Sequence, residues 1–474
     1  MKKIFIFFIV INFSLISLAQ KNISGIWQGI LTAGGGIEVH LVFNIKDSAG
    51  VYSVTMDSPD QGVKGIPASI NTTGDSILIT AGKGAAKYMG LIKNDSTIYG
   101  TWLQGASYPL NIKKVKEIEM ARRPQTPKAP FPYRSQDVIY FNKDKSIQYG
   151  ATITIPEGKG PFPSLLLLTG SGQTNRDEEM LQHRPFAVIA DYLTKKGYIV
   201  MRVDDRGVGQ TTGDLKNATT RDFATDGEVS FDYLKNINEV DKKHMGLLGH
   251  SEGGMIAQII AAERSDIDFI VSLAGPGEKV TTLMEEQNEA LLRINGIPES
   301  IIKGYVSFYK DLLPTIINAH DLEDAKTSVS KLLDNWISKS DKNTVILTTG
   351  INGPGTKEKY INVLLSQMYL PWYLYFIKYD PDIYLQKIHS KILALDGDKD
   401  IQVIAKSNLS SMETSLKKGP SKNITFLELK GLNHLFQHCN TCTPQEYGKL
   451  EETIAPEALE TISNWLKMNV YKAK

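Results

Sequence analysis

The chain has almost no net charge and few cysteines, and several common motifs are missing from it. Its 53 basic and 52 acidic residues leave a net charge of +1, which gives no reason to expect nucleic acid or an anionic membrane as a partner. No G-x-x-x-x-G-K-[ST] sequence is present, so the glycine-rich stretch at residues 169–173 is not a phosphate-binding P-loop. The only two cysteines, Cys439 and Cys442, lie far from the N-terminus, which argues against a lipoprotein.

Residues 1–19 have the composition of an export signal. Two lysines supply a positive start, an apolar run follows at residues 4–11, and Ser17-Leu18-Ala19 is a small-x-small cleavage site. The alternative is a membrane anchor, but the apolar run is short for a membrane span. We therefore expect an exported protein, periplasmic or secreted, that begins near Gln20 and has no stable membrane insertion after removal of the signal.

The chain of 474 residues is too long for one ordinary domain and suits two or three. Residues 20–118 are predicted to be all-β, because short alternating segments are separated by turn sequences rich in Gly, Asn and Asp. The expected strands include residues 37–45, 51–56, 77–80 and 97–102. Trp27 and Trp102 are expected to fill the core of a small barrel or sandwich, with ligand stacking as the alternative. No catalytic cluster is recognisable in this domain.

A linker and an α/β domain are predicted to follow. Residues 119–134 are charged and then proline-rich, which indicates a partly extended linker. In residues 135–474 a hairpin is followed by strands that alternate with helices, which predicts a mainly parallel sheet with helices on both faces. The expected strands are residues 137–141, 148–155, 164–169, 198–203, 245–248, 269–274, 391–395 and 424–429, and the expected helices include 185–196, 222–235, 255–263 and 456–467.

One long interruption, residues 277–388, breaks this alternation and is expected to form a helical cap over the site. Helical sequences lie at residues 280–293, 300–318 and 325–338, and an aromatic segment follows at residues 368–384. The aromatic side chains are expected to pack within the protein, with substrate contact as the alternative. They are Trp372, Tyr373, Tyr375 and Phe376.

The stretch of residues 245–263 carries the strongest functional signal. A short apolar run, Gly249-His250-Ser251-Glu252-Gly253 and a helix-favouring segment follow one another, which is the order of a nucleophile elbow. The sharp turn would strain the backbone of Ser251 and expose its hydroxyl above the sheet, while the flanking glycines allow close approach. The helix N-terminus behind the serine favours developing negative charge. The alternative is a glycine turn with an incidental serine, which the flanking strand and helix disfavour.

With these motifs in place, residues 135–470 resemble the α/β-hydrolase fold, and among its members the capped serine carboxylesterases and the proline-iminopeptidase-like enzymes. The resemblance rests on the elbow and on five further segments. These are residues 165–177 (LLLLTGSGQTNRD), 204–209 (DDRGVG), 274–276 (AGP), 397–403 (GDKDIQV) and 431–434 (GLNH). Serine, acid and histidine follow one another in the order of that fold.

A serine hydroxyl is a weak nucleophile, so it needs a base, and the base needs a carboxylate to orient it and to stabilise its charge. His434 lies in a loop after the last predicted strand, where the fold has its histidine, and His438 is the alternative. The resemblance places the acid at the end of a G-x-x-D turn that precedes an apolar or glutamine pair. That residue is Asp400, with Asp398 as the alternative. The expected triad is therefore Ser251, Asp400 and His434.

The tetrahedral intermediate also needs hydrogen-bond donors for its oxyanion. One is expected to be the backbone N–H of Glu252, the residue after the nucleophile. The other is expected from the loop at residues 169–173, with Ser171 favoured and Gly172 next. Asp205-Arg206-Gly207 is expected to brace this loop, with a substrate role as the alternative.

The expected function is two-step hydrolysis of a small-molecule carboxylic ester through an acyl-enzyme on Ser251, with no metal or organic cofactor needed. One rival is a peptidase that removes N-terminal residues. It would require a carboxylate pair in the cap, for which Glu285-Glu286 is a candidate, although acidic pairs on exposed helices are usually solvated. A rival from another class is a non-catalytic binding protein on the same fold, against which the intact triad argues.

Cys439 and Cys442 form a C-x-x-C sequence shortly after His434. We expect a structural disulfide, because the export signal directs the chain to an oxidising compartment. A zinc site that included a neighbouring histidine would compete for the catalytic base, and a redox pair lacks its thioredoxin-type βαβ context. The bridge is expected to stiffen the loop that carries His434.

Overall fold

The structure is a computed structural model that describes residues 22–32 and 38–470. Its internal contacts divide the chain into a first unit, Met1–Met120, and a second unit, Ala121–Lys474. The predicted export signal lies outside the described residues, so its role stays a prediction. None of the helices within the described ranges combines the length and the apolar character that a membrane span requires.

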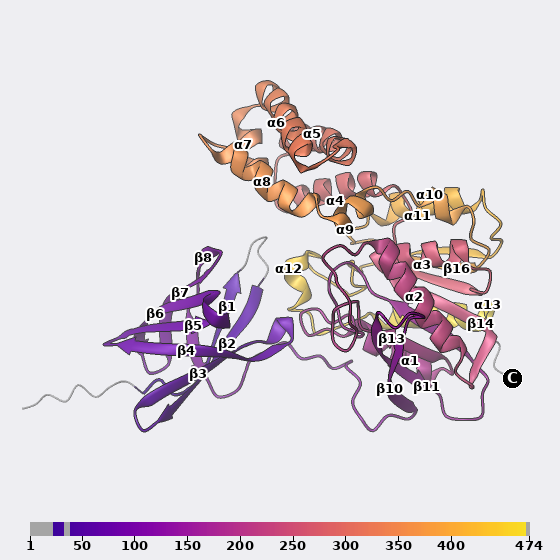
Figure 1. Ribbon diagram of the computed structural model, residues 1–474, viewed down its shortest axis with the longest axis horizontal. Helices are drawn as coiled ribbons and strands as arrows, with labels where there is room; N and C mark the ends of the chain where they lie inside the picture. Colours follow the sequence, from indigo (N-terminus) through magenta and orange to yellow (C-terminus); the bar gives the residue numbers. More distant parts are fainter. Residues whose placement is uncertain (1–21, 33–37, 471–474) are drawn as a thin grey trace, which may run out of the picture. The chain divides into compact units, whose positions relative to one another are not determined.

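The first unit is an antiparallel β-barrel. Its strands are β1 (Gly25–Thr32), β2 (Glu38–Ser48), β3 (Val51–Ser58), β4 (Val63–Thr73), β5 (Ser76–Ala81), β6 (Ala86–Asn94), β7 (Thr97–Gln104), β8 (Ala106–Pro109) and β9 (Ile112–Val115). They follow the order β6-β5-β4-β3-β2-β1-β9-β7-β8, and an additional pairing of β6 with β7 closes the sheet (Figure 1). Trp27 and Trp102 are 0% and 1% exposed, which confirms that both fill the core.

The second unit is built on an eight-stranded sheet of order β10-β11-β13-β12-β14-β15-β16-β17. The strands are β10 (Arg134–Phe141), β11 (Gln148–Ile155), β12 (Phe162–Leu168), β13 (Ile199–Val203), β14 (Val240–His250), β15 (Phe269–Leu273), β16 (Lys391–Gly397) and β17 (Ile424–Leu429). The hairpin β10–β11 and the β11–β13 pair are antiparallel, and every pairing from β13 to β17 is parallel. The mainly parallel sheet predicted from the sequence is therefore confirmed.

Helices cover both faces of this sheet. Those that connect or follow the strands are α1 (Pro185–Lys195), α2 (Thr220–Lys235), α3 (Glu252–Glu263), α11 (Ala405–Leu416), α12 (Pro444–Tyr447) and α13 (Pro456–Asn469). Buried side chains of α1 and α13 share one apolar cluster, and those of α2, α3 and α11 share another on the opposite face. The start of α2 is fixed by a capping box, in which Asp222 Oδ2 accepts the backbone N–H of Thr219 at 2.9 Å.

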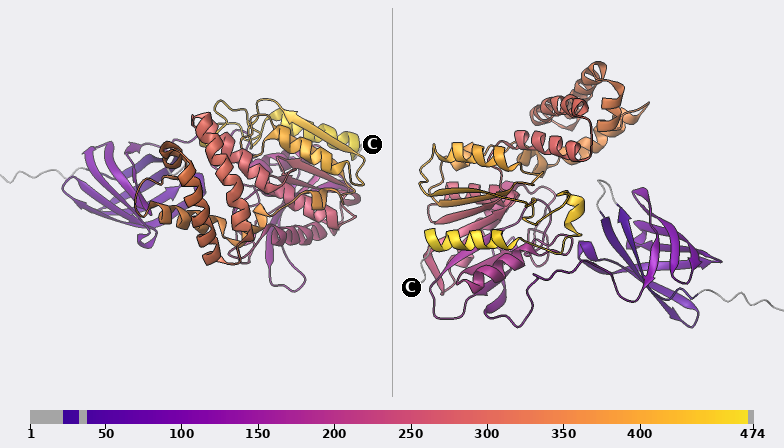
Figure 2. Two further views of the ribbon diagram at one scale, coloured as in Figure 1. Left: turned by 90° about the horizontal axis from the view of Figure 1, so that it is seen from above. Right: turned by 180° about the vertical axis from the view of Figure 1, so that it is seen from behind.

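The interruption between β15 and β16 forms the predicted helical cap. Its helices are α4 (Val280–Ile294), α5 (Glu299–Asn318), α6 (Leu322–Lys339), α7 (Lys342–Thr349), α8 (Thr356–Met368), α9 (Pro371–Ile377) and α10 (Asp382–Leu385). Figure 1 shows α4 and α9 over the helices that cover this face of the sheet, with α5, α6 and α7 farther from the sheet. The cap packs into the apolar cluster that also holds α2, α3 and α11, and α13 lies on the other side of the sheet (Figure 2).

The proline-rich segment after Met120 is bound to the second unit near both of its ends, which differs from the linker that its composition predicts. The Arg123 guanidinium donates to the carbonyl oxygens of Gly448 and Leu450, both at 2.8 Å. Gln125 Nε2 donates to another carbonyl of the same region at 2.6 Å. Tyr133 is buried, and its hydroxyl donates to an aspartate of α1 at 2.9 Å. We name residues 121–133 the strap.

A chain that begins at Ala121 is expected to fold and to keep the activity of the second unit on small soluble substrates. The two units have separate apolar cores, and no strand among the described residues belongs to both sheets. Circular dichroism, thermal unfolding and assays beside the full chain would check this result. A matched chain that begins at Ser135 lacks the strap and should melt at a lower temperature. Aggregation of the chain that begins at Ala121 would show that the barrel is needed for folding.

Candidate active site

The loops that carry the predicted site residues follow neighbouring parallel strands. Residues 169–173 follow β12, Ser251 follows β14, Asp400 follows β16 and His434 follows β17. Because the carboxyl ends of parallel strands meet at one edge of a sheet, four segments far apart in the sequence converge there.

Ser251 occupies a strained turn between β14 and α3. Its backbone has φ of 52° and ψ of −119°, a left-handed φ that is uncommon for a residue with a side chain. The turn is fixed by a hydrogen bond from Ser251 N to Leu273 O at 2.8 Å. A Cβ atom on Gly249 would lie 2.1 Å from Gly253 O, so only glycine allows β14 and α3 to approach this closely. These features have the geometry of a nucleophile elbow.

His434 and Asp400 form a buried pair. The distance from His434 Nδ1 to Asp400 Oδ2 is 2.7 Å, and each residue is 5% exposed. The other carboxylate oxygen, Oδ1, accepts the backbone N–H groups of Gln402 and Val403 at 2.7 and 2.9 Å. A proton on Nδ1 faces the carboxylate and leaves Nε2 unprotonated, which is the tautomer that a general base requires.

The two alternative residues have other partners. Asp398 Oδ1 accepts the backbone N–H of Gly431 at 2.6 Å, so Asp398 fixes a loop. His438 is paired with Glu452 and Glu457, 3.0 and 2.8 Å away, at an exposed position. The structure therefore brings Asp400, and not Asp398, to His434.

Ser251 and His434 both adjoin His250. Ser251 follows it in the chain, and the ring centroids of His250 and His434 are 4.9 Å apart. Among the described residues, no hydrogen bond joins the Ser251 hydroxyl to His434. Hydrogen bonds between catalytic groups are often long in the absence of substrate and tighten when it binds.

The backbone of the loop at residues 169–173 lies against the nucleophile. A Cβ atom on Gly170 would lie 3.3 Å from the Cβ of Ser251. The N–H of Gly170 is already occupied, because it donates to Glu178 Oε1 at 2.6 Å. Of the predicted oxyanion donors, Ser171 and Gly172 follow Gly170 in this loop, and the N–H of Glu252 lies at the start of α3.

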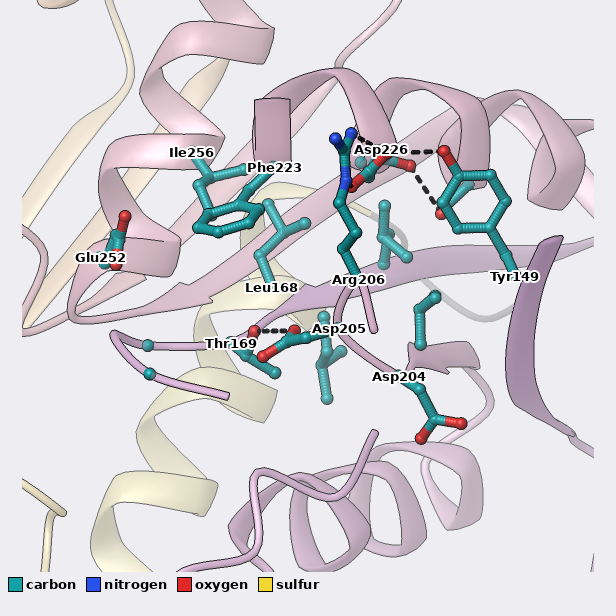
Figure 3. A pocket seen from close by; sticks show the side chains of 17 residues that line it. Tyr149, Leu168, Thr169, Asp204, Asp205, Arg206, Phe223, Asp226, Glu252 and Ile256 are labelled. Atoms are coloured by element: carbon teal, nitrogen blue, oxygen red, sulfur yellow. Dashed lines mark hydrogen bonds and ion pairs between the residues drawn. The ribbon is translucent and has the colours of Figure 1, made fainter. Parts of the chain in front are cut away.

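Asp205 braces this loop, as the sequence predicts. Its carboxylate accepts the hydroxyl of Thr169 at 2.5 Å (Figure 3). It also accepts both the N–H and the hydroxyl of Thr174 at 2.9 Å. Arg206 is held by two hydrogen bonds to Asp226, at 2.8 and 2.9 Å, so its guanidinium serves the scaffold. The cavity drawn in Figure 3, of about 50 Å³, has room for a few water molecules at most and not for an ester substrate.

Burial raises the pKa of the Asp205 carboxyl to about 7, although its three hydrogen bonds act to lower it. A folded-state pKa above the unfolded value of about 3.9 means that stability is lost as the pH rises through this range. Asp205→Asn removes the ionisation and can keep hydrogen bonds to both threonines. Its stability relative to the parent chain should therefore rise by about 3 kcal/mol between pH 4 and pH 7. Thermal unfolding over that range checks this, and a difference that does not vary with pH would contradict it.

The side chain of Glu252 joins three parts of the second unit. It is 2% exposed, and its Oε1 accepts the hydroxyl of Thr220 at 2.6 Å and the indole N–H of Trp372 at 2.9 Å. Burial raises the pKa of this carboxyl, and a hydrogen bond from Ser171 is among the contacts that oppose the rise. Trp372 stacks on Phe376 within the cap. Its hydrogen bond to Glu252 also connects helix α9 to the elbow. The sequence gives no sign of this link.

Cys439 and Cys442 form the predicted disulfide. Both sulfur atoms are thereby unavailable to zinc, and within the described ranges no group of three or more acidic, histidine or cysteine side chains is placed to hold a metal ion. The loop has a second anchor as well. Glu446 accepts the backbone N–H groups of Asn440, Thr441 and Cys442 at 3.1, 2.9 and 2.8 Å.

Cys439→Ser is expected to cost little stability, towards the low end of roughly 0–5 kcal/mol, because the bridged loop is short. Since Glu446 holds the same loop, turnover should fall only a few-fold. Thermal unfolding and kcat of the variant check both effects, and Glu446→Gln in the same background should deepen the loss of turnover. A double variant with unchanged kcat would show that this loop does not position His434.

Residues 183–326, less than a third of the chain, match the family described as serine aminopeptidase, S33. Esterase EstD of Thermotoga maritima is 35% identical over 135 residues, 28% of this chain and 32% of that protein. Acyl-coenzyme A thioesterase 1 of Mus musculus is 26% identical over 169 residues, 36% of each chain. The chain thus spans about a third of the length of these curated relatives.

Among solved structures, an esterase of Pyrococcus furiosus has a TM-score of 0.44 and 14% identity, over 75% of this chain and 100% of that one. Est1E of Butyrivibrio proteoclasticus, with ferulic acid bound, has a TM-score of 0.39 and 16% identity, over 70% of this chain and 99% of that one. The second unit has the α/β-hydrolase fold, and over part of its length the chain is similar to a serine aminopeptidase family, to esterases and to acyl-coenzyme A thioesterases.

Proposed function

We propose that the chain is a serine hydrolase that cleaves carboxylic esters through an acyl-enzyme on Ser251. The observation that carries the proposal is the joint arrangement of a strained serine turn after β14 and a buried His434–Asp400 pair after β17 and β16. Strained backbone and a histidine oriented by a carboxylate are the features that activate a serine hydroxyl. The similarity to esterases supports an ester as the substrate.

In the first step, His434 Nε2 takes the proton of the Ser251 hydroxyl while Oγ forms a bond to the ester carbonyl carbon. The carbonyl oxygen becomes an oxyanion, which the N–H groups of Glu252 and of Ser171 or Gly172 stabilise. Asp400 stabilises the imidazolium through Nδ1. The intermediate then collapses, the bond to the leaving alcohol breaks, and His434 returns its proton to that alcohol.

In the second step, water takes the place of the alcohol. His434 removes a proton from the water as its oxygen bonds to the acyl carbon, and the same donors hold the second oxyanion. Breakage of the bond to Oγ releases the carboxylic acid, and the proton on His434 returns to Ser251. Each step uses only the side chains, the backbone N–H groups and the water molecule named here.

A serine aminopeptidase is the second candidate, and the description of the matched family favours it. The sequence offers Glu285-Glu286 for binding a substrate amine. Glu286 accepts a hydrogen bond from the hydroxyl of Ser407 in α11 and adjoins Glu278, whose pKa is raised to about 7 by burial and by Glu286. Because Glu286 is engaged in this contact between the cap and α11, it is a poor candidate for binding a substrate amine. We therefore prefer the ester function.

Export is part of the proposal. The signal-like residues 1–19 support it, and so does the Cys439–Cys442 disulfide, because such bridges persist in oxidising compartments. The intact mass of protein recovered from the periplasm or medium should match a chain that begins near Gln20. Recovery of the full-length chain from the cytoplasm alone would contradict export.

Parallel assays with four substrate classes test the proposed activity. They are p-nitrophenyl acetate, p-nitrophenyl butyrate, acyl-coenzyme A thioesters and aminoacyl p-nitroanilides. A Ser251→Ala preparation measured alongside removes the background. We expect the p-nitrophenyl esters to give the highest kcat/KM. A higher value for the anilides would favour the aminopeptidase, and no turnover of any class would favour a non-catalytic binding protein.

A further inference from the structure

A second buried histidine–carboxylate pair lies beside the proposed triad. His250 Nδ1 is 2.9 Å from Glu178 Oε1, and the two residues are 7% and 4% exposed. His250 is the residue before the nucleophile, and its ring lies 4.9 Å from that of His434, measured between centroids. Neither residue of this pair has a part in the two-step mechanism.

Both ring nitrogens of His250 face acceptors. Nε2 lies 3.0 Å from the carbonyl oxygen of His434, and a carbonyl oxygen can only accept, so Nε2 carries a proton. Glu178 Oε1 accepts the N–H of Gly170 and also faces Nδ1 of His250. Burial alone would lower the pKa of His250, but the charge of Glu178 and the hydrogen bonds to Glu178 and His434 raise it. His250 therefore has a hydrogen-bond partner at each ring nitrogen.

The neighbouring charges hold Glu178 in place. The backbone of Glu178 has a left-handed φ of 52°. The two residues that precede Glu178 in the chain are both ion-paired. Asp177 is paired with Arg202, and Arg176 donates to Asp204 Oδ2 at 2.6 Å. Thus the carboxylate that faces His250 sits in a segment that is ion-paired to β13 and to the loop after it.

This geometry joins the elbow to the two loops on which the reaction depends. Through Glu178, His250 is linked to Gly170, the residue before the proposed oxyanion donor Ser171. Through Nε2 it holds the main chain of the proposed base. A displacement of about 1 Å in a catalytic group can cost on the order of 10²-fold in rate.

We propose that His250, held between the carboxylate of Glu178 and the carbonyl oxygen of His434, is a positioning residue that fixes the backbone of His434 relative to Ser251. The inference rests on the proposed function, because it assigns a role to His250 within that reaction. It accounts for a buried charge pair next to the nucleophile that ester chemistry itself does not use. Such a pair contributes little net stability once desolvation is counted, so its value lies in geometry.

Two double variants test this role: Glu178→Gln with His250→Gln, and Glu178→Gln with His250→Asn. Both replace the buried ion pair with neutral amides, so neither leaves an unpaired charge. A glutamine side chain reaches about as far as Nε2 and can still donate to the carbonyl of His434. An asparagine side chain reaches only as far as Nδ1 and cannot. His244→Gln, at a half-buried histidine–aspartate contact on the same strand, is the control.

The readouts are kcat and KM for p-nitrophenyl butyrate and the rate at which a fluorophosphonate labels Ser251, each per active site. We expect the variant with His250→Asn to have a kcat and a labelling rate about 10–100-fold below the parent, with little change in KM. The variant with His250→Gln should have a kcat and a labelling rate at least several-fold higher than those of the variant with His250→Asn. The melting temperatures of the two double variants should be similar.

Equal kcat per active site in the two double variants would overturn the positioning role, and so would a loss that follows melting temperature alone. Failure of the proposed function has a different signature. In that case the parent chain would neither hydrolyse the ester nor react with the fluorophosphonate. Labelling of Ser251 in the parent therefore keeps the two questions separate.

Discussion

Ser251→Ala is expected to lower kcat for p-nitrophenyl esters by on the order of 10⁶ and to leave the fold intact. The change removes only Oγ, the atom that would bond to the acyl carbon. The backbone of residue 251 keeps its Cβ, its left-handed φ and the hydrogen bond from its N–H to Leu273 O, so the elbow should retain its shape. His434, Asp400 and the oxyanion donors remain, but they have no nucleophile to activate.

The measurement compares steady-state hydrolysis with covalent labelling. A fluorophosphonate should label Ser251 in the parent chain, as peptide mass spectrometry would show, and should not label the variant. Ser366→Ala, at an exposed cap position, serves as the matched control and should retain parental kcat. Residual turnover of the Ser251→Ala protein near the parental level, or labelling of another serine, would exclude Ser251 as the nucleophile.

The parts of the fold that the sequence predicts well are those set by local patterns. Continuous apolar runs identify the buried parallel strands, because both faces of such strands are covered. The elbow was predictable because the strand, the two glycines and the helix are consecutive, and the clash that any Cβ on Gly249 would cause explains the need for glycine there. The pairing of Asp400 with His434 was suggested by the family resemblance and by the position of each residue after a strand.

The sequences of the missed elements argue against the structures that they form. Strand β4 alternates between exposed and half-buried residues, but it contains Pro67, and proline disfavours a strand. The strap has the charged and proline-rich composition of a linker. Its attachment comes from Arg123 and Gln125, which bind main-chain carbonyls of segments more than 300 residues away. Hydrogen bonds to a distant backbone have no signature in composition.

The same reason explains why sequence reasoning missed the contacts behind the site. Glu178 lies in the charged run Asp177-Glu178-Glu179, which looks solvated in the sequence, yet folding places it against His250, 72 positions away. Glu252 was assigned only a backbone role, although its side chain binds Thr220 and Trp372. Charged residues inside or next to catalytic motifs are a usable signal, because a charge there is buried only when it has partners.

Asp400→Asn is expected to lower kcat by about 10⁴, a much larger loss than Asp398→Asn should cause. The structure gives a specific reason. Asp400 Oδ1 accepts two backbone N–H groups, from Gln402 and Val403, so the oxygen of an introduced amide would take that place. The amide nitrogen would then face His434 Nδ1, where Oδ2 now lies at 2.7 Å. His434 Nδ1 could accept a proton from this amide only if Nδ1 itself were unprotonated. Nε2 would then carry the ring proton and could not act as the base.

Aspartate and asparagine have nearly the same shape, so the substitution should not disturb packing. The loss of kcat would come from the changed charge and from the amide donor that faces His434. Thermal unfolding of Asp400→Asn should therefore stay close to that of the parent, while kcat and fluorophosphonate labelling fall together. Asp398→Asn is the matched control from the same loop, since Asp398 contacts Gly431 and not His434. If Asp398→Asn were the inactive variant and Asp400→Asn kept most of its turnover, the acid would be Asp398, and the His434–Asp400 contact would serve only the fold.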